Sequence, residues 1–172
     1  MDSSRNLVLV GFMGTGKSAV GRRVAALAAA PFLDMDAELE RRAGKSIARI
    51  FAEDGEPAFR DQEARLAEEW GRKQGAVISC GGGVVLREAN LRALGANGLL
   101  VCLTARPDVI LARTAHSKKR PLLADADPER KIRDLLAARA PYYAAIPVQF
   151  DTSGRTPEEL AAQVLARWKQ PD

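Results

Sequence analysis

The chain contains few of the side chains that bind zinc or form disulfide bonds. Its 172 residues include two cysteines, Cys80 and Cys102, and a single histidine. Two thiols and one imidazole cannot complete a four-ligand zinc site alone, and both cysteines lie in or beside apolar runs, where small thiols are usually buried. We therefore expect neither a zinc centre nor a disulfide bond.

Long apolar runs and blocks of one charge are also missing. No apolar run approaches the roughly 20 residues that cross a membrane as a helix, and the apolar stretch before Gly11 is too short for a signal peptide. The net charge is +4, but basic residues alternate with acidic ones, as between Glu38 and Arg42, which is typical of solvated helix faces. We expect a cytoplasmic protein that binds neither nucleic acid nor membrane.

Short apolar runs with a strand pattern alternate with longer segments of helical periodicity. The predicted strands are 6–10, 31–33, 76–79, 99–103 and 148–151. This alternation is typical of βαβ units, so the expected fold class is α/β, with a central parallel five-stranded sheet and helices on both faces. A length of 172 residues suits one domain covering 1–172.

Capping residues and prolines mark where several helices begin. Helix starts are predicted at Arg106–Asp108, Asp127–Glu129 and Thr156–Glu159, each with a proline in the first turn. The helix after Asp127 is expected to end at Arg139, before Pro141. Residues 114–125 lie between helical patterns but lack periodicity, which predicts a mobile lid.

A glycine-rich loop follows the first predicted strand. Residues 11–18, GFMGTGKS, match the pattern G-x-x-x-x-G-K-[ST], in which glycines let backbone N–H groups surround a polyphosphate. The helical pattern that follows directs the positive end of a helix dipole at the same anion. Lys17 is expected to reach the β- and γ-phosphates, and Ser18 to bind Mg²⁺. The alternative is a glycine-rich turn that matches the pattern by chance.

Two carboxylates follow the second predicted strand. Asp34 and Asp36 come at its carboxyl end, which faces the ligand crevice in a parallel sheet. Mg²⁺ keeps several waters and needs only one or two carboxylates, so Asp34 is a candidate for contact with the metal. Asp36 could instead cap the helix that begins at Ala37.

Glycines and arginines complete the set of candidates. Gly81–Gly83 follow the third strand, and three glycines at this edge favour close approach of the backbone to a small ligand over a merely flexible turn. Arg60, Arg120 and Arg139 are candidates for anion binding, although each alone could be a solvated cation, and Arg139 could complement a helix C-terminus.

Taken together and in order, these motifs resemble the shikimate kinase family. The matching pieces are Gly11–Ser18, FLDMD at 32–36, AFR ending at Arg60, GGG at 81–83, RPLL from Arg120 and ARAPYY around Arg139. The resemblance spans nearly the whole chain. It implies a three-layer P-loop kinase fold, like that of nucleoside monophosphate kinases, and transfer of the γ-phosphate of ATP to the 3-hydroxyl of shikimate, in aromatic amino acid biosynthesis. Ala19 and Cys80 depart from the family pattern, and neither departure touches a proposed role.

The same resemblance implies a role for individual residues. Lys17, Asp36 and Arg120 would be catalytic, and Ser18, with Asp34 through water, would hold one Mg²⁺ ion. The ATP-binding residues would be Gly14, Thr15, Gly16, Lys17, Ser18, Ala19, Arg113, Arg120 and Arg155, with the loop 153–157 beside adenine. The shikimate-binding residues would be Asp36, Arg60, Gly81, Gly82, Gly83 and Arg139. We expect a monomer with ATP and shikimate as its small-molecule partners.

Three other readings of the sequence predict different ligands. Asp151–Gly154 matches the D-x-x-G pattern of GTPases, but it follows the last strand and no N-K-x-D motif accompanies it. A gluconate or nucleotide kinase would share the P-loop, yet Arg60 and Arg139 favour a compact acceptor with a carboxylate. A purely structural nucleotide-binding module would lack both an acceptor site and a lid arginine.

Overall fold

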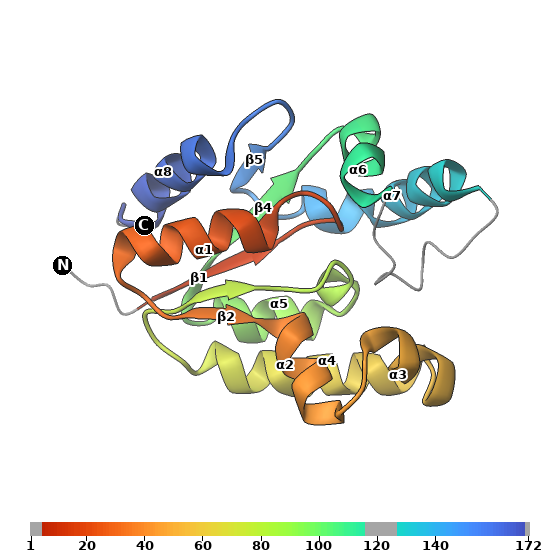
Figure 1. Cartoon of the computed structure of the whole chain (residues 1–172). Coiled ribbons are helices and arrows are strands. Elements are labelled where there is room, and N and C mark those ends of the chain that lie inside the picture. The colour runs from red at the N-terminus through yellow and green to blue at the C-terminus, as the bar shows by residue number, and fades with distance from the viewer. Residues whose placement is uncertain (1–4, 116–126, 171–172) are drawn as a thin grey trace.

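A five-stranded parallel sheet is at the centre of the fold. The computed structural model describes residues 5–115 and 127–170, and within them the strand order is β2-β3-β1-β4-β5 (Figure 1). The strands are β1 (Asn6–Val10), β2 (Phe32–Asp34), β3 (Val77–Ser79), β4 (Gly98–Thr104) and β5 (Gln149–Asp151). The predicted α/β class and the positions of its strands are confirmed.

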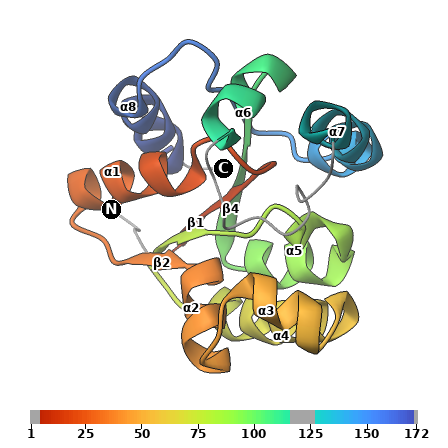
Figure 2. The same ribbon diagram turned by 45° about the vertical axis from the view of Figure 1, so that its right-hand side comes forward.

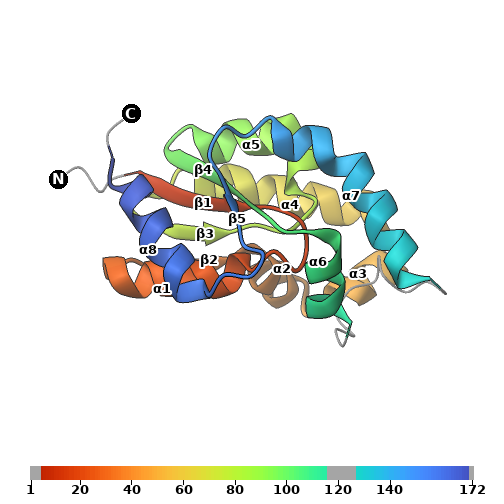
Figure 3. The same ribbon diagram turned by 90° about the horizontal axis from the view of Figure 1, so that it is seen from above.

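Helices cover both faces of this sheet. They are α1 (Lys17–Ala28), α2 (Met35–Ala43), α3 (Ile47–Glu53), α4 (Glu56–Gly71), α5 (Glu88–Gly95), α6 (Pro107–Thr114), α7 (Pro128–Ala144) and α8 (Pro157–Trp168), with a 3-10 turn, η1 (Val84–Leu86), after β3. α1 and α8 lie side by side over one face, and α4 and α5 cover the other (Figures 1 and 3). Figure 2 shows α2, α3 and α4 together on the β2 side, with α6 and α7 on the β4 side. Among the described helices, none is both long and apolar enough to span a membrane.

The central strand shows why the sheet is covered on both faces. All five residues of β1 are buried. Leu7 and Leu9 belong to the core cluster under α1 and α8, whereas Val8 and Val10 belong to the cluster on the α4 and α5 face. Successive side chains of a strand point to opposite faces, so a continuous apolar run fits a strand buried on both sides. Both cysteines are free and buried, and burial raises the pKa of each thiol.

The predicted starts of α6, α7 and α8 are confirmed, but the alternative role of Asp36 as a cap and the predicted end of α7 are wrong. Asp127 and Thr156 cap α7 and α8, the latter with a full capping box. The cap of α2 is Asp34, not Asp36, because the backbone is still extended at Asp34 and its carboxylate accepts a bond from Ala37 N–H. Asp36 therefore lies in the first turn of α2.

The second error concerns the end of α7. This helix does not end at Arg139 but continues through Pro141 to Ala144. A proline inside a helix removes one backbone hydrogen bond. The last turn is supported instead from β5, because the Gln149 amide donates to the carbonyl oxygens of Tyr143 and Ile146. The extension places Tyr143 on the same helix as Arg139, one turn later.

Candidate active site

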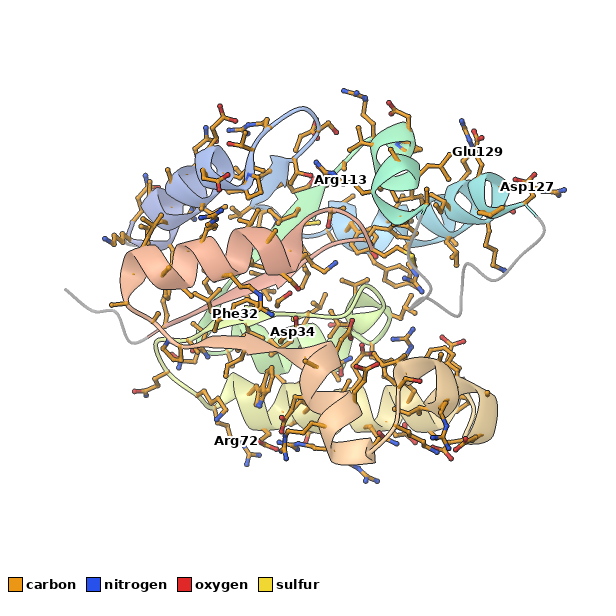
Figure 4. All side chains as sticks on the ribbon, in the orientation of Figure 1. Phe32, Asp34, Arg72, Arg113, Asp127 and Glu129 are labelled. Carbon is orange, nitrogen blue, oxygen red and sulfur yellow. The ribbon has the colours of Figure 1, made fainter. Side chains whose placement is uncertain are left out.

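A cavity of about 490 Å³ lies at the carboxyl edge of the sheet. Its walls come from the turns after β1, β2 and β3 and from helices on both sides. The predicted site residues that line it are Gly14, Gly16, Lys17, Ser18, Ala19, Asp34, Asp36, Arg60, Gly81, Gly82, Gly83, Arg113 and Arg139. Figure 4 shows Asp34 at the end of β2 and Arg113 on α6, on opposite sides of the P-loop (residues 11–18). One cavity thus joins the P-loop to two arginines that are distant in sequence.

The P-loop turns sharply between β1 and α1. Gly11, Gly14 and Gly16 have φ values of +144°, +76° and +95°, a region that side chains rarely tolerate. A Cβ atom on Gly11 would also lie 2.2 Å from the carbonyl oxygen of Leu103. Lys17 Nζ donates to the carbonyl oxygens of Gly11 and Phe12, at 2.8 and 2.9 Å. A lysine ammonium and the start of α1 are therefore both in place for an anion.

Hydroxyl and carboxylate oxygens meet beside the P-loop. Ser18 Oγ donates to Asp34 Oδ2 at 3.0 Å and lies 3.2 Å from Ser79 Oγ. These are the hard oxygen ligands that Mg²⁺ prefers. The described residues include no group of three or more histidine, cysteine, aspartate or glutamate side chains that could hold a metal alone. The Ser18 hydroxyl and the Asp34 carboxylate therefore fit an ion whose other ligands are phosphate oxygens and water, as is usual for Mg²⁺ with a nucleotide.

The far end of the cavity contains an arginine held by two glutamates. Arg60 Nη1 donates to Glu63 Oε2 at 2.9 Å, and Nη2 donates to Glu56 Oε1 at 3.2 Å. A Cβ atom on Gly83 would lie 2.3 Å from Arg60 Nη2, so a side chain at this position would displace the guanidinium. The sequence predicted that a small ligand closely approaches the backbone of the three glycines. In the structure, side chains of the site itself lie close to this backbone.

A buried carboxylate, Glu63, lies beside Asp36. The Glu63 side chain has almost no exposed surface, and its Oε1 has no hydrogen-bond partner among the described residues. Burial raises the pKa of Glu63, and the neighbouring Arg60 opposes this rise. A Cβ atom on Gly81 would lie 2.8 Å from Asp36 Oδ1 and 3.1 Å from Glu63 Oε1. The first glycine thus lets two carboxylates approach the backbone of the turn after β3.

Arg139 reaches the same region from α7. Its side chain is buried, with 4% of the residue exposed, and its Cζ lies 5.8 Å from the centroid of the Phe12 ring. A Cβ atom on Gly82 would lie 3.5 Å from Arg139 Nη1, and the charges of both Arg60 and Arg139 lower the pKa of Glu63. Two guanidinium groups from different helices therefore meet at one end of the cavity.

Arg113 connects three segments beside the P-loop. Its Nη1 donates to the carbonyl oxygen of Gly14 at 3.1 Å and to Thr152 Oγ1 at 3.0 Å, and its Nη2 donates to the carbonyl oxygen of Thr152 at 3.0 Å. These bonds tie α6 to the P-loop and to the loop after β5. The guanidinium therefore lies beside the P-loop at Gly14.

The predicted residues that do not line the cavity are few. Thr15 is buried and donates to the carbonyl oxygen of Phe12, and Arg155 contacts the carbonyl oxygen of Asp151 in an exposed loop. Arg120 and most of the predicted lid, 114–125, lie outside the described residues. Sequence reasoning missed Ser79 and Glu63. Their signals were weak: Ser79 ends a strand at the ligand edge, and Glu63 follows Arg60 by one helical turn.

Comparison with known proteins decides the family. A sequence model described as shikimate kinase matches residues 13–169 of the chain. The chain belongs to the shikimate kinase family. A shikimate kinase of Caldanaerobacter subterraneus subsp. tengcongensis is 45% identical over 161 residues, 94% of each chain, and one from Pseudomonas syringae pv. syringae is 44% identical over 95% of each. The chain is therefore an ATP-using kinase.

Solved structures agree with this membership in the shikimate kinase family. A shikimate kinase from Acinetobacter baumannii, in complex with shikimate, has a TM-score of 0.92 and 36% identity, and the match covers 96% of this chain and 93% of that one. A shikimate kinase from Aquifex aeolicus has a TM-score of 0.80, 33% identity and 94% coverage of both chains. A gluconokinase from Sinorhizobium meliloti has a TM-score of 0.61, but at 20% identity it shows only a shared fold.

Proposed function

We infer that the cavity at the carboxyl edge is where the chain transfers the γ-phosphoryl group of ATP to the 3-hydroxyl of shikimate, a step in aromatic amino acid biosynthesis. The convergence of a P-loop and two buried arginines on one cavity carries this inference. One end offers a lysine and a helix N-terminus to a polyphosphate. The other end offers two guanidinium forks to a planar carboxylate. The related structure that contains shikimate supports the assignment.

The P-loop and α6 form the ATP end. We assign contacts with ATP to Gly14, Thr15, Gly16, Lys17, Ser18, Ala19, Arg113, Arg120 and Arg155. When ATP binds, Lys17 exchanges its two carbonyl partners for the β- and γ-phosphates. Its charge then stabilises the transferring group. Backbone N–H groups at the start of α1 bind the same anion, and Arg113 lies where it can flank the base.

Ser18 and Asp34 are the residues that would hold Mg²⁺, Ser18 directly and Asp34 through water. A bound Mg²⁺ ion neutralises charge on the β- and γ-phosphate oxygens. The chain's own contribution is orientation, because the Ser18 hydroxyl is fixed between Asp34 and Ser79.

Replacing Asp34 by asparagine is expected to weaken the apparent affinity for Mg²⁺ without unfolding the protein. Asparagine still caps α2, but it removes the negative charge beside Ser18. The Mg²⁺ concentration that gives half-maximal activity should rise roughly tenfold or more. Activity measured against Mg²⁺ at fixed ATP checks this, with Asp61→Asn on the exposed face of α4 as the control. Unchanged Mg²⁺ dependence in Asp34→Asn would remove Asp34 from the metal site.

The end of the cavity that contains Arg60 and Arg139, which we call the acceptor end, orients shikimate for attack. Arg60 and Arg139 grip the carboxylate, and Gly81–Gly83 pack against the ring. Asp36, which reaches Gly81, accepts a hydrogen bond from the 3-hydroxyl and directs its oxygen toward the γ-phosphate. Holding both reactants in one cavity makes transfer effectively intramolecular, which is the main contribution that phosphoryl transfer requires of a protein.

Arg120 is proposed to close over the transferring phosphoryl group as part of the lid. Arg120→Ala should therefore lower kcat more than it raises the KM for shikimate, because the interaction forms only as charge develops in the transition state. Steady-state kinetics with shikimate varied at saturating ATP measure both constants. Full catalysis by the variant would mean that Arg120 belongs to a surface loop without a role in transfer.

Product analysis tests the reaction itself. After incubation with ATP, Mg²⁺ and shikimate, ³¹P NMR should show ADP and one new phosphomonoester, coupled to the proton on carbon 3. A phosphate on another hydroxyl would contradict the proposed orientation. The single domain over 1–172, the cytoplasmic location and the monomeric state are further predictions, and size-exclusion chromatography tests the last of these.

A further inference from the structure

A tyrosine on α7 is bonded to the glycine turn at the acceptor end. Tyr143 Oη donates to the carbonyl oxygen of Gly82 at 2.7 Å, across 61 positions of sequence. Tyr143 is 7% exposed, and it lies one helical turn after Arg139. It does not line the cavity of the proposed active site. It therefore touches the wall of that site from behind.

The bond joins two walls that have to stay at a fixed separation. Gly82 belongs to the turn after β3, whereas Arg139 belongs to α7. An added Cβ on Gly82 would already be in ordinary contact with Arg139 Nη1, at 3.5 Å. No backbone ladder connects these two elements, so the Tyr143 hydroxyl makes a direct polar link between them.

The surroundings of the phenol make it a permanent donor. Burial raises the pKa of Tyr143 to about 12, although the charge of Arg139 and a hydrogen bond with the Arg139 side chain oppose the rise. The hydroxyl therefore stays protonated at any ordinary working pH. The helix end that carries it is also anchored, since the Gln149 amide donates to the carbonyl oxygen of Tyr143 from β5. The donor, its helix and its acceptor are thus all fixed.

We propose that Tyr143 is a positioning residue that holds the Gly82 turn against Arg139 and so sets the width of the carboxylate-binding end of the cavity. The proposal rests on the proposed function, in which Arg139 grips the carboxylate of shikimate. Because Tyr143 does not line the cavity, it does not touch shikimate. It acts by keeping Gly82 and Arg139 at the separation that shikimate needs.

Tyr143→Phe tests this role because it removes only the hydroxyl and keeps the ring in the core. We expect the KM for shikimate to rise about tenfold, the effect of one lost hydrogen bond that leaves its acceptor unpaired. The value of kcat and the KM for ATP should stay within about twofold of wild type. Tyr142→Phe is the matched control: its ring is on the same turn but 44% exposed, and all constants should be unchanged.

A double variant separates positioning from general stability. In an Arg139→Ala background, Tyr143→Phe should change the KM for shikimate less than twofold, because the group it positions is gone. The proposal is overturned if Tyr143→Phe lowers thermal stability while its KM for shikimate stays at the wild-type value. It is equally overturned if Tyr143→Phe raises the KM for shikimate by the same factor in the Arg139→Ala background as in the wild-type protein. Failure of the proposed function is distinct, because wild-type protein would then not phosphorylate shikimate at all.

Discussion

Replacing Lys17 by alanine is expected to remove nearly all turnover while the protein stays folded. The ammonium binds the transferring group in the proposed complex, and loss of one such group from a preorganised site costs roughly 10²–10³-fold in kcat. The fold should persist because Lys17 belongs to neither core cluster, and its ammonium donates to backbone carbonyl oxygens of the P-loop. Steady-state kcat and thermal unfolding, measured on the same preparation, check both statements.

Lys73→Ala is the matched control for this substitution. Lys73 is exposed beyond the end of α4 and does not line the cavity, so its loss should leave kcat unchanged. Near-normal turnover in folded Lys17→Ala protein would exclude the P-loop as the site of phosphate binding.

Replacing Arg139 by alanine is expected to lower kcat/KM for shikimate by a factor equivalent to roughly 2–4 kcal/mol of transition-state stabilisation. The reason is that a charge-assisted pair is lost from a buried site. Binding of ATP should hardly change, since Arg139 lies against the Gly82 turn, whereas Arg113 contacts the P-loop at Gly14. Lysine should restore little, because a point charge cannot reproduce the guanidinium fork. Arg133→Ala on the exposed face of α7, where Arg133 pairs with Glu129, is the control and should have no effect on kcat/KM.

An acceptor analogue isolates the contact with the carboxylate. Shikimate with a neutral amide in place of its acid never makes the full interaction, so Arg139→Ala should reduce its kcat/KM much less. Comparing acid and amide in both proteins gives a double-mutant cycle in which effects on folding cancel. Equal losses for acid and amide would mean that Arg139 acts on folding or on ATP.

Arg60 should behave differently from Arg139 under the same substitution. Arg60→Ala leaves the fully buried Glu63 carboxylate without its only hydrogen-bond donor among the described residues. An unpaired buried charge is strongly destabilising. We therefore expect Arg60→Ala to lower the thermal midpoint as well as kcat/KM, and Arg139→Ala is the clearer test of the carboxylate grip.

Local patterns were enough to predict most of the fold. The strands of the sheet are short apolar runs bounded by turn residues, and the P-loop pattern fixes the first crossing from strand to helix. Parallel strands have their carboxyl ends on one edge, so Lys17, Asp34 and Gly81 could be placed together from sequence. The meeting of Arg60 and Arg139 could not be derived locally, and only the family resemblance predicted it.

The details that sequence did not predict depend on contacts between distant segments. Glu63 reads as one more charge on an amphipathic helix until α4 packs its carboxylate beneath the turn after β3. Pro141 is a reliable signal for a helix end, but bonds from Gln149 support the last turn of α7 and allow it to continue. Asp34 combines a cap of α2 with a bond to Ser18, and a pattern of two aspartates does not reveal which one caps.

The most direct measurement is the rate of ADP release from ATP and Mg²⁺ with different acceptors. Shikimate, gluconate and nucleoside monophosphates should be compared at equal concentrations with wild-type protein and with Arg139→Ala. We expect kcat/KM to be far highest for shikimate and to fall for shikimate alone when Arg139 is removed. Faster ADP release with gluconate or a nucleoside monophosphate than with shikimate would contradict the assignment of this cavity to a compact carboxylated acceptor.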